Sequence, residues 1–469
     1  MHNIFRTKHL TPDDHGHSGL KRCLTAFDLT LLGIGAIIGT GIFVLTGIAA
    51  ATQSGPAVML SFVIAGIACT FAALSYSELA ASVGGCGSAY GYSYAAFGEL
   101  FAWIIGWDLL LEYGVAVAAV ANGWSGYFGK VLALLGLSIP ELWTKAPVLG
   151  GYMNLPAMLI VFLLMILLIV GVKEGARVNA VAVTIKLATI AVFIAVAMFN
   201  VDPQNWSPFM PFGWFGHGED GKPIGVLAGA SLVFFAYVGF DAVSTAAEEA
   251  RNPRRDLPIG IISSLLFCTL IYIIVSGLLT GVVPYASLNV SYPVAFALEQ
   301  VGVRWASALV ATGAFMGLTT VMLVLYYALT RILFALGRDG LLPAYLGHVN
   351  PRTQTPVRVI VISGVVMMII AGFIPLGELA ELVNIGTLAA FVMVCVGVIV
   401  MRRTRPDLPR PFMMPFGSTL PVLGALSCGA LMAFLPLMTW VRFAIWLAIG
   451  LAVYFAYSVR HSKLAQSQP

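Results

Sequence analysis

Residues 33–43 of this chain, Gly33-Ile34-Gly35-Ala36-Ile37-Ile38-Gly39-Thr40-Gly41-Ile42-Phe43, lie in the middle of an apolar run from Phe27 to about Gln53. The run is long enough to cross a bilayer, but each glycine inside a helix costs about 1 kcal/mol relative to alanine. In lipid, an unwound segment survives only where protein or a water-filled cavity surrounds its backbone. The stretch therefore indicates either a membrane helix broken beside a cavity or a glycine-rich packing face.

If the helix is broken, its second half begins near Gly41, and its positive N-terminal end suits a carboxylate. A second stretch of this kind, Gly229–Asp241, lies five apolar segments further along the chain. Because five is odd, two successive sets of five helices would run in opposite directions. Interrupted helices at corresponding positions of two inverted halves indicate the binding site of a transporter, so the second stretch favours the broken helix.

The composition is that of a polytopic membrane protein. Of the 469 residues, 59% are hydrophobic and 10% are charged, and the mean hydropathy is +0.93, whereas soluble domains carry about 25% charged residues. The basic residues are spread among loops, so the net charge of +4 does not indicate a nucleic-acid partner. The first 25 residues lack the apolar core of a cleaved signal peptide.

Twelve apolar segments are long enough to span a membrane. They are Phe27–Gln53, Pro56–Val83, Ala95–Tyr127, Met153–Gly171, Val178–Phe199, Ile224–Ala247, Leu257–Val283, Ser307–Leu336, Val357–Phe373, Leu379–Met401, Leu420–Met438 and Val441–Ser458. With both termini inside, 19 of the 25 lysines and arginines lie inside and five outside, which predicts cytoplasmic termini and a location in the cell (inner) membrane. The expected divisions are a cytoplasmic N-terminal segment (1–25), two sets of five helices (26–200 and 224–402), two further helices (416–459) and a cytoplasmic tail (460–469).

Lys186 is the one basic residue left within the membrane. It lies nine residues past Arg177, or about 13–14 Å along a helix. A charged lysine at that depth costs about 2.5–3.5 kcal/mol on insertion scales, and burial disfavours its charged form. Lys186 could therefore gain and lose a proton and couple proton movement to conformation. The alternative is a fixed ammonium that donates to carbonyl groups at a helix end.

Three of the carboxylates within the apolar segments are candidates for a role in the site. Asp108 and Glu112 share one face of the third segment, four residues apart. Glu112 either borders the cavity or belongs to a buried hydrogen-bonded network, because carboxylates in membranes are normally partnered. Asp241 follows the second interruption and either binds unwound amides or caps the next helical piece.

Other side chains are candidates for the walls of the site. The aromatic residues around the second interruption could fold over a ligand as a gate, although aromatic residues also fill cores. Met316, Leu318 and Thr319 on the eighth segment are candidate wall residues. All seven histidines fall outside the apolar segments, and no phosphate-binding loop, metal-ligand spacing or catalytic motif is present, so neither a cofactor nor an enzymatic activity is expected.

Three motifs in order resemble the amino acid–polyamine–organocation superfamily. They are Gly33–Phe43 with the following Val44-Leu45-Thr46-Gly47, then Glu248-Glu249-Ala250-Arg251-Asn252-Pro253-Arg254-Arg255-Asp256-Leu257-Pro258, and Arg338-Asp339-Gly340-Leu341-Leu342-Pro343. Over about residues 20–460 the chain is similar to the cationic amino acid transporter branch in a short bacterial form. The resemblance implies an all-α LeuT-type fold, in which helices one to five and six to ten form inverted repeats and helices eleven and twelve are peripheral.

The resemblance also implies roles for individual residues. Ile37, Thr40 and Gly41 would hold the substrate's carboxylate, while backbone around Phe235, Ala236 and Val238 would bind its amino group, with Phe235 as the gate. Lys186 would replace the sodium ion of sodium-driven relatives, so that protons drive transport. Glu112 would match an acidic position near the substrate, and the residue that limits side-chain size would lie within Met316–Thr319.

The expected function is therefore proton-coupled symport of amino acids by alternating access. Met316 and Leu318 are bulky and apolar, which favours neutral substrates slightly; a cationic substrate would need Glu112 or Asp241 within reach. An exchanger of the same fold is the alternative, and a non-transporting sensor is disfavoured by the short tails. The expected partners are the amino acid, a proton and the lipid bilayer, and the sequence is compatible with a small membrane subunit or an oligomer.

Overall fold

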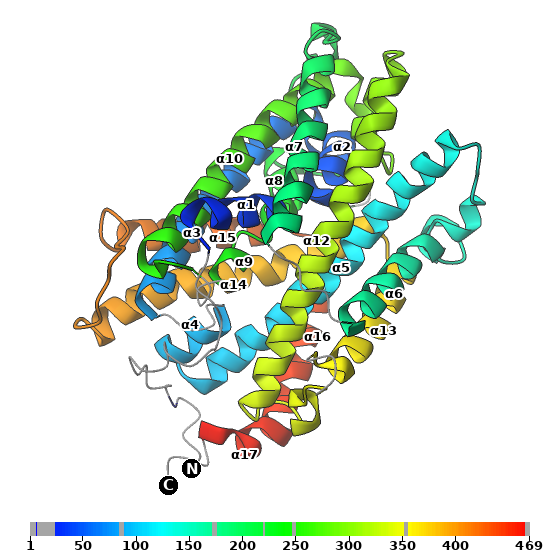
Figure 1. Cartoon of the computed structure of the whole chain (residues 1–469). Helices are drawn as coiled ribbons and strands as arrows, with labels where there is room; N and C mark the ends of the chain where they lie inside the picture. Colours follow the sequence, from blue (N-terminus) through cyan, green and yellow to red (C-terminus); the bar gives the residue numbers. More distant parts are fainter. Residues whose placement is uncertain are drawn as a thin grey trace.

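The structure, a computed structural model, describes Arg6 and residues 24–83, 89–170, 176–218, 221–245, 250–350 and 355–464. For residues 176–180 and Thr245 it describes the backbone alone. Most of the predicted segments 1–25 and 460–469, and Glu248 and Glu249 of the second motif, lie outside this part of the chain. The described residues form a bundle of helices (Figure 1) with one two-stranded antiparallel ribbon, β1 (Gly216–His217) and β2 (Pro223–Ile224).

In chain order the α-helices are α1 (Ala26–Ile37), α2 (Thr46–Ala49), α3 (Val58–Val83), α4 (Ala89–Ala96), α5 (Glu99–Leu134), α6 (Leu155–Val170), α7 (Ala176–Ala197), α8 (Val226–Val233), α9 (Ala242–Thr245), α10 (Pro253–Val282), α11 (Pro293–Gln300), α12 (Arg304–Arg338), α13 (Val357–Phe373), α14 (Leu376–Thr404), α15 (Thr419–Ala433), α16 (Leu437–Val453) and α17 (Val459–His461). Long connections separate α5 from α6, α7 from α8, α12 from α13 and α14 from α15, and the other connections are shorter. The π-helical turns η2 (Gly41–Leu45) and η3 (Ala50–Ser54) flank α2, and the 3₁₀ turn η8 (Phe234–Tyr237) follows α8.

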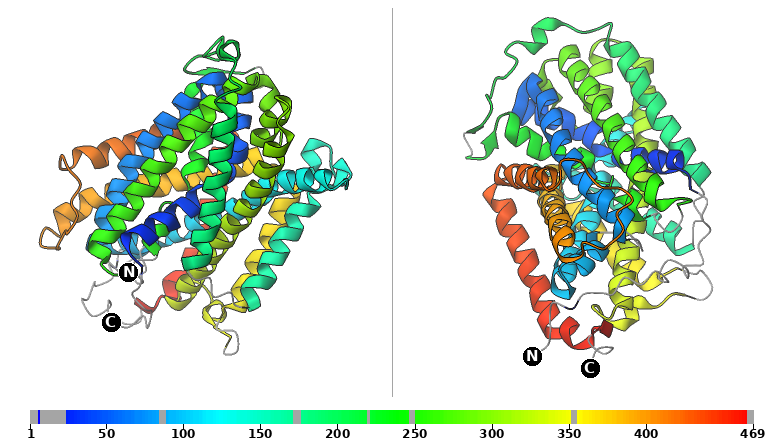
Figure 2. Two further views of the ribbon diagram at one scale, coloured as in Figure 1. Left: turned by 45° about the horizontal axis from the view of Figure 1, so that its top comes forward. Right: turned by 90° about the vertical axis from the view of Figure 1, so that its left-hand side faces the viewer.

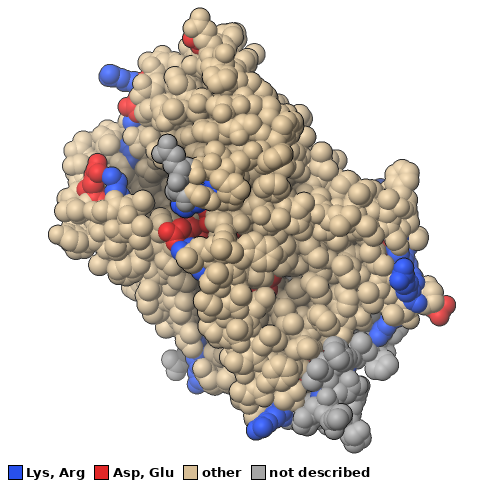
Figure 3. Space-filling model, turned by 180° about the vertical axis from the view of Figure 1, so that it is seen from behind, with Lys and Arg blue, Asp and Glu red and all other residues tan. Residues whose placement is uncertain are grey.

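The described chain is a multi-pass membrane protein. Seven of its helical stretches are long and apolar enough to cross a membrane: Gly41–Val83, Glu99–Leu134, Val226–Ser244, Pro253–Val282, Arg304–Arg338, Leu376–Thr404 and Leu437–His461. Five shorter apolar helices accompany them. Large apolar side chains point outward from several helices, among them Leu163 of α6, Leu270 of α10 and Ile369 of α13. The face seen in Figure 3 is mostly uncharged, and its charged side chains gather in a few separate groups. A large uncharged surface is expected where lipid surrounds a protein.

The long helices α5, α12, α10, α3 and α14 form the centre of the bundle. α5 packs against both α12 and α14, and α10 packs against both α3 and α1. α8 is enclosed by α3, α14 and α15, so that seven of its eight residues are buried. α15 and α16 lie at one side of the bundle in the right-hand view of Figure 2, where they contact α14.

Both ends of the described chain meet at Glu99, the first residue of α5. The Glu99 N–H donates to the Arg6 carbonyl (3.0 Å), and the Ser462 hydroxyl donates to Glu99 Oε2 (2.5 Å). The hydroxyl groups of Tyr94 and Tyr454 also donate to this carboxylate. We call this part of the molecule the Glu99 end.

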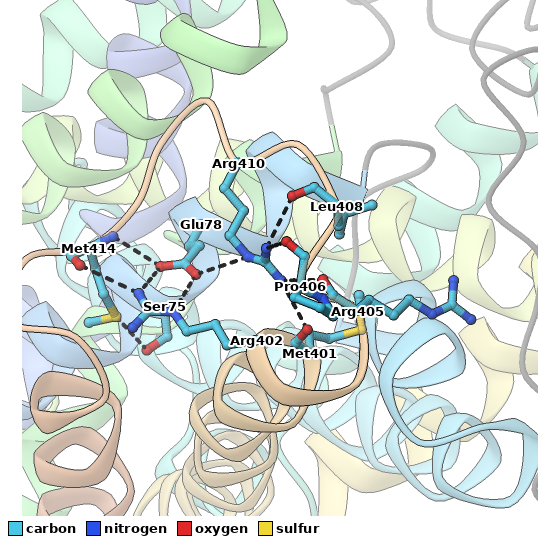
Figure 4. A network of polar contacts seen from close by, with 9 residues as sticks. All are labelled: Ser75, Glu78, Met401, Arg402, Arg405, Pro406, Leu408, Arg410 and Met414. Atoms are coloured by element: carbon cyan, nitrogen blue, oxygen red, sulfur yellow. Dashed lines mark hydrogen bonds and ion pairs between the residues drawn. The ribbon is translucent and has the colours of Figure 1, made fainter.

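The linker between α14 and α15 is held by a buried ionic network (Figure 4). Glu78 of α3, whose side chain is 2% exposed, accepts two hydrogen bonds from Arg402 and one from the Met414 N–H (2.9 Å). Arg410 donates to the carbonyl groups of Met401 (2.9 Å) and Arg405 (2.8 Å), which closes the C-terminal end of α14. Carbonyl groups at a helix end lack intrahelical partners, so this contact satisfies them. The linker is therefore fixed to α3 and α14.

Candidate binding site between two interrupted helices

The first interruption lies at the predicted position. α1 ends at Ile37, and Ile38 is extended (φ −72°, ψ 101°), its N–H bonded back to the Ile34 carbonyl. Helical structure resumes at Thr40, and the π-helical turn η2 begins at Gly41. The first N–H groups of this second piece have no partner within a helix. The stretch is thus a helix broken into two pieces, as its glycines indicate.

The second interruption has a similar form. α8 passes into the 3₁₀ turn η8, Val238 is extended (ψ 131°), and Gly239 has φ +111° before α9 begins. Residues with a side chain rarely adopt that φ. A Cβ on Gly239 would also lie 3.2 Å from the carbonyl group of Ala36. Gly239 therefore reverses the chain and lets the second interruption pack against the end of α1.

The two interruptions are in direct contact. A Cβ on Gly41 would lie only 2.2 Å from Ala236 Cα, so only glycine permits this approach. Tyr272 of α10 bridges the same region, because its hydroxyl lies 2.9 Å from the carbonyl oxygens of both Ile37 and Ala236. The hydroxyl has one proton and donates to one of them at a time. Tyr272 is fully buried and thereby ties both interruptions to α10.

A second polar side chain fastens α8. The Asn384 amide of α14 donates to the carbonyl groups of Ser231 (2.7 Å) and Leu232 (3.0 Å) near the end of α8. Neither Asn384 nor Tyr272 is among the residues that sequence reasoning selected. Their only signal is a hydrogen-bonding group within an apolar run, and that signal does not specify a partner.

A small cavity lies where the interruptions meet. Its lining comes from both interruptions and from two long helices: Ala36, Ile37, Gly39, Thr40, Gly41, Phe235 and Val238, with Ala116 and Val120 of α5 and Val321 and Leu325 of α12. The space open to the centre of a water-sized sphere is about 10 Å³, room for about one water molecule. The buried Thr40 hydroxyl has no hydrogen-bond partner among the described residues. The cavity thus has a polar side at Thr40 and an aliphatic side on α5 and α12.

Five of the six residues predicted to contact the substrate line this cavity. They are Ile37, Thr40, Gly41, Phe235 and Val238. The sixth, Ala236, lies directly behind Gly41. Phe235 is 5% exposed, so its ring is enclosed within the bundle.

The three predicted wall residues on α12 lie elsewhere. Met316 is 47% exposed on the outside of the bundle, and Leu318 is buried away from the cavity. The Thr319 hydroxyl accepts from Trp124 Nε1 (2.9 Å) and donates to the Phe315 carbonyl (3.0 Å). The expectation that a residue within Met316–Thr319 limits the size of the substrate's side chain stays a prediction, because this cavity is too small to hold an amino acid. α12 contributes Val321 and Leu325, which are four residues apart and share one helical face.

Lys186 connects α7 to the interruption of the first helix. Its ammonium donates to the Gly35 carbonyl (2.6 Å) in the last turn of α1, and the residue is 1% exposed. A Cβ on Gly317 of α12 would lie 2.9 Å from Lys186 Cγ, so the lysine stem lies against this glycine. The predicted contact with a helix-end carbonyl is present, and both interpretations of Lys186 are compatible with it.

The three carboxylates form a buried cluster beside the cavity. Tyr113 donates to Asp241 Oδ2 (2.6 Å), and a Cβ on Gly386 of α14 would lie 2.7 Å from Asp108 Oδ1. The carboxylate oxygens of Asp108 and Glu112 have no hydrogen-bond partner within the described ranges. None of the three lines the cavity, but Glu112 is one helical turn from Ala116, which does. Across the same ranges, no three His, Cys, Asp or Glu side chains are placed to hold a metal ion.

The short helix α11 packs against the second piece of the broken helix. A Cβ on Gly47 would lie 2.5 Å from Pro293 Cβ at the start of α11. Helix α5 contacts both elements, because Tyr127 donates to the Phe43 carbonyl (2.8 Å) and Lys130 forms an ion pair with Glu299 of α11 (2.5 Å). These contacts join α11, α5 and the second piece of the broken helix.

Comparison with known proteins gives one consistent result. A family model described as amino acid permease matches residues 24–460. The chain is 51% identical to the branched-chain amino acid permease BcaP of Bacillus subtilis (strain 168), over 99% of both chains. It is 50% identical to the methylthioribose transporter of the same strain, over 99% of this chain and 100% of the relative. It is 38% identical to the vacuolar cationic amino acid transporter 4 of Arabidopsis thaliana, over 87% of this chain and 68% of the relative.

Proposed function

Because the chain belongs to the amino acid permease family, we propose that it carries neutral amino acids with aliphatic side chains across the cell membrane, together with protons. Family and relatives identify a transporter rather than an enzyme. The observation that carries the choice of substrate is the cavity wall, which presents Ala116, Val120, Val321 and Leu325 opposite Thr40. A charged substrate side chain in this wall would lose its hydration without gaining a partner.

The substrate's ends are assigned by the chemistry of the two interruptions. The carboxylate binds the N–H groups of Thr40 and Gly41, which begin the second helical piece, and the Thr40 hydroxyl, which has no partner among the described residues. The amino group faces backbone around Phe235, Ala236 and Val238. The aliphatic side chain then lies against α5 and α12. Glu112, Asp108 and Asp241 lie outside the cavity lining, which leaves the substrate's side chain without a carboxylate partner.

The chain is arranged as twelve membrane-spanning segments in a LeuT-type fold. The seven long stretches and five shorter apolar helices correspond to twelve segments. In this count the stretch Gly41–Val83 is divided, so that its part before α3 joins α1 as one broken span and α3 is the next span. Helices α1–α7 (26–200) and α8–α14 (224–402) form the inverted repeats, each opening with an interrupted helix, and α15–α17 (416–459) are peripheral. Arg6 and Ser462 meet at Glu99, which agrees with an even number of crossings. The distribution of lysine and arginine is what supports cytoplasmic termini.

Transport requires the cavity to open and close. A volume of about 10 Å³ does not hold an amino acid, so substrate entry requires the helices around the cavity to separate. Phe235 stands in the lining and acts as the gate. The described conformation is a closed intermediate between states that open to either side of the membrane.

Lys186 supplies the proton coupling. A charged ammonium makes a hydrogen bond roughly twice as strong as a neutral one, and this bond holds the last turn of α1 at Gly35. Loss of the proton weakens that hold beside the substrate's carboxylate site. Protonation of Lys186 and binding of substrate therefore favour the same arrangement of α1.

Uptake by the purified protein in liposomes tests the proposal. The panel contains leucine, valine, arginine and 5-methylthioribose, each with and without an inward proton gradient. We expect leucine and valine to accumulate only with the gradient. Accumulation of arginine or 5-methylthioribose instead would contradict the aliphatic pocket, and counterflow that ignores the gradient would assign an exchanger.

A further inference from the structure

A groove lies between the start of α10 and the linker that follows α14, and none of its lining residues lines the cavity. It has a volume of about 470 Å³. Its walls include Arg254 and Arg255, the apolar side chains of Ile259 and Ile262, and Pro411 and Phe412 of the linker. The arginines belong to the motif Arg254-Arg255-Asp256-Leu257-Pro258, which the binding site described above does not use.

The rim of the groove is positively charged. Arg254 and Arg255 are exposed in the first turn of α10, and their guanidinium groups make no hydrogen bond or ion pair with another described residue. The Asn252 side chain does not cap this helix, and the Asp256 carboxylate accepts from the Asn252 N–H (3.1 Å). The helix end adds its own partial positive charge to that of the arginines. The rim therefore suits an anion.

The floor of the groove is apolar and continues into the membrane. Ile259 is followed on α10 by Leu266, Leu270 and Ile274, which are 39%, 53%, 59% and 38% exposed in that order. Their spacings of seven, four and four residues place them on one side of the helix. In a membrane protein this exposed stripe faces acyl chains. A ligand in the groove therefore meets cationic groups and a hydrocarbon-facing surface side by side.

The opposite wall is already in place. Arg410 directly precedes Pro411, and its guanidinium is bonded to the carbonyl groups at the end of α14 (Figure 4). Two residues after Phe412, the Met414 N–H is bonded to Glu78. The Glu78 charge is balanced by Arg402, so it does not oppose an anion in the groove. The groove thus requires no folding of the linker when a ligand binds.

We propose that this groove binds one anionic phospholipid from the leaflet in which α1 and α10 both begin. Leu24 and Ala250 are bridged just before these helices, and the Arg251 N–H donates to the Leu24 carbonyl (2.8 Å). The lipid phosphate binds Arg254 and Arg255, and one acyl chain lies along the α10 stripe. A soluble anion leaves the apolar floor uncovered, and a cytoplasmic peptide does not reach Leu270. An anionic phospholipid supplies both chemistries at this depth.

The test compares lipid binding to the full-length protein and three variants in detergent. Phosphatidylglycerol or phosphatidylcholine is added, and the unfolding temperature and the lipids retained in native mass spectrometry are measured. We expect phosphatidylglycerol to raise the unfolding temperature of the wild type above that with phosphatidylcholine, because a ligand that binds only the folded state stabilises it. The R254A/R255A variant should lose this difference and the retained lipid.

Two further variants separate the causes. R403A/R460A removes two exposed arginines elsewhere and should keep the preference for phosphatidylglycerol. Ile262→Trp fills the floor of the groove without changing its charge. This variant should lose the preference for phosphatidylglycerol. Glycerol 3-phosphate carries the headgroup chemistry without acyl chains and should have no effect on unfolding. The proposal is overturned if R254A/R255A keeps the wild-type preference, if R403A/R460A loses it equally, or if glycerol 3-phosphate reproduces the full stabilisation.

Discussion

Gly33, Gly35, Gly39 and Gly41 follow one another closely in the chain, and each meets a different neighbour. A Cβ on Gly33 would lie 2.4 Å from Ser264 Oγ, so this glycine packs α1 against α10. The Gly35 carbonyl accepts a hydrogen bond from Lys186. Gly39 lines the cavity, and Gly41 lies against Ala236. The broken helix and the packing face, which are alternatives in the sequence, therefore occur together within one stretch.

The difference between two of these glycines is testable. A Cβ on Gly39 would lie 3.4 Å from Val321 Cγ2, whereas one on Gly41 would overlap Ala236. Gly39→Ala should therefore fold with an unchanged unfolding temperature but take up leucine with a KM raised several-fold, because the methyl group enters the cavity. Gly41→Ala should unfold at a lower temperature and lose uptake of every substrate. Equal effects of the two variants on stability would contradict these assignments.

Lys186→Ala tests the coupling role of the lysine. The variant should lose proton-driven accumulation in liposomes, because no titratable group then holds the Gly35 carbonyl. Counterflow of substrate without a gradient should persist. If accumulation still follows the proton gradient, Lys186 is a structural ammonium that only joins α7 to α1.

Gly317→Ala is the matched variant that keeps the amine. Its methyl group would lie 2.9 Å from Lys186 Cγ and would displace the lysine stem. We expect proton-driven uptake to weaken without disappearing and the pH dependence of uptake to move. An unchanged pH profile would show that the position of the stem is unimportant.

At the scale of elements, α10 ties the interruptions together through Tyr272. Tyr272→Phe keeps the ring contacts with Phe62 and Tyr237, whose centroids lie 5.3 and 5.4 Å away. It removes one hydroxyl, which costs about 1 kcal/mol of stability. Because the lost bonds reach Ile37 and Ala236, leucine uptake should also fall.

The control for this change is Tyr326→Phe. Tyr326 is an equally buried tyrosine whose hydroxyl donates to the Ile360 carbonyl, away from the interruptions. Thermal unfolding should show similar losses for both variants, while only Tyr272→Phe should reduce uptake. Similar uptake by the two would contradict a bridging role for Tyr272.

α11 gives a second prediction at this scale. Glu299→Gln removes the ion pair with Lys130. The Glu299 side chain is 40% exposed and the Lys130 side chain is 11% exposed. Exposed pairs contribute about 1 kcal/mol or less, so the fold should persist while α11 separates more often. Hydrogen exchange of α11 amides should therefore become faster. Glu378→Gln, which breaks the comparable pair with Arg442, should leave α11 unchanged.

The sequence predicts the interruptions because their causes are local. The extended backbone of Ile38 and the positive φ of Gly239 depend on residues that are neighbours in the chain. It does not predict which residues of α12 face the cavity, because the rotation of that helix depends on its packing against α5 and α7. Met316, Leu318 and Thr319 do not line the cavity, although Val321 is only two residues past Thr319. The carbonyl groups that Tyr272 reaches, those of Ile37 and Ala236, likewise depend on the packing of elements that are far apart in the chain.

At the scale of the whole molecule, hydropathy predicts most of the helices but not their ends. The expected third segment, Ala95–Tyr127, is divided in the structure between α4 and α5, which begins at Glu99 and continues to Leu134. The division falls at Gly98, whose φ is +93°. α11 is not expected at all, since eight residues are too few for a span. These differences concern helix ends and a helix too short to span the membrane, which hydropathy does not predict.

The junction at Glu99 also has a consequence for how the protein is made. Glu99 and Ser462 are 363 residues apart in the chain. At a synthesis rate of about 5–20 residues per second, Ser462 is added roughly 20 to 70 seconds after Glu99. Until the ribosome has passed Ser462, this carboxylate lacks one of its donors inside a partly inserted bundle. A residue that is translated late therefore completes the hydrogen bonding of a helix that was made much earlier.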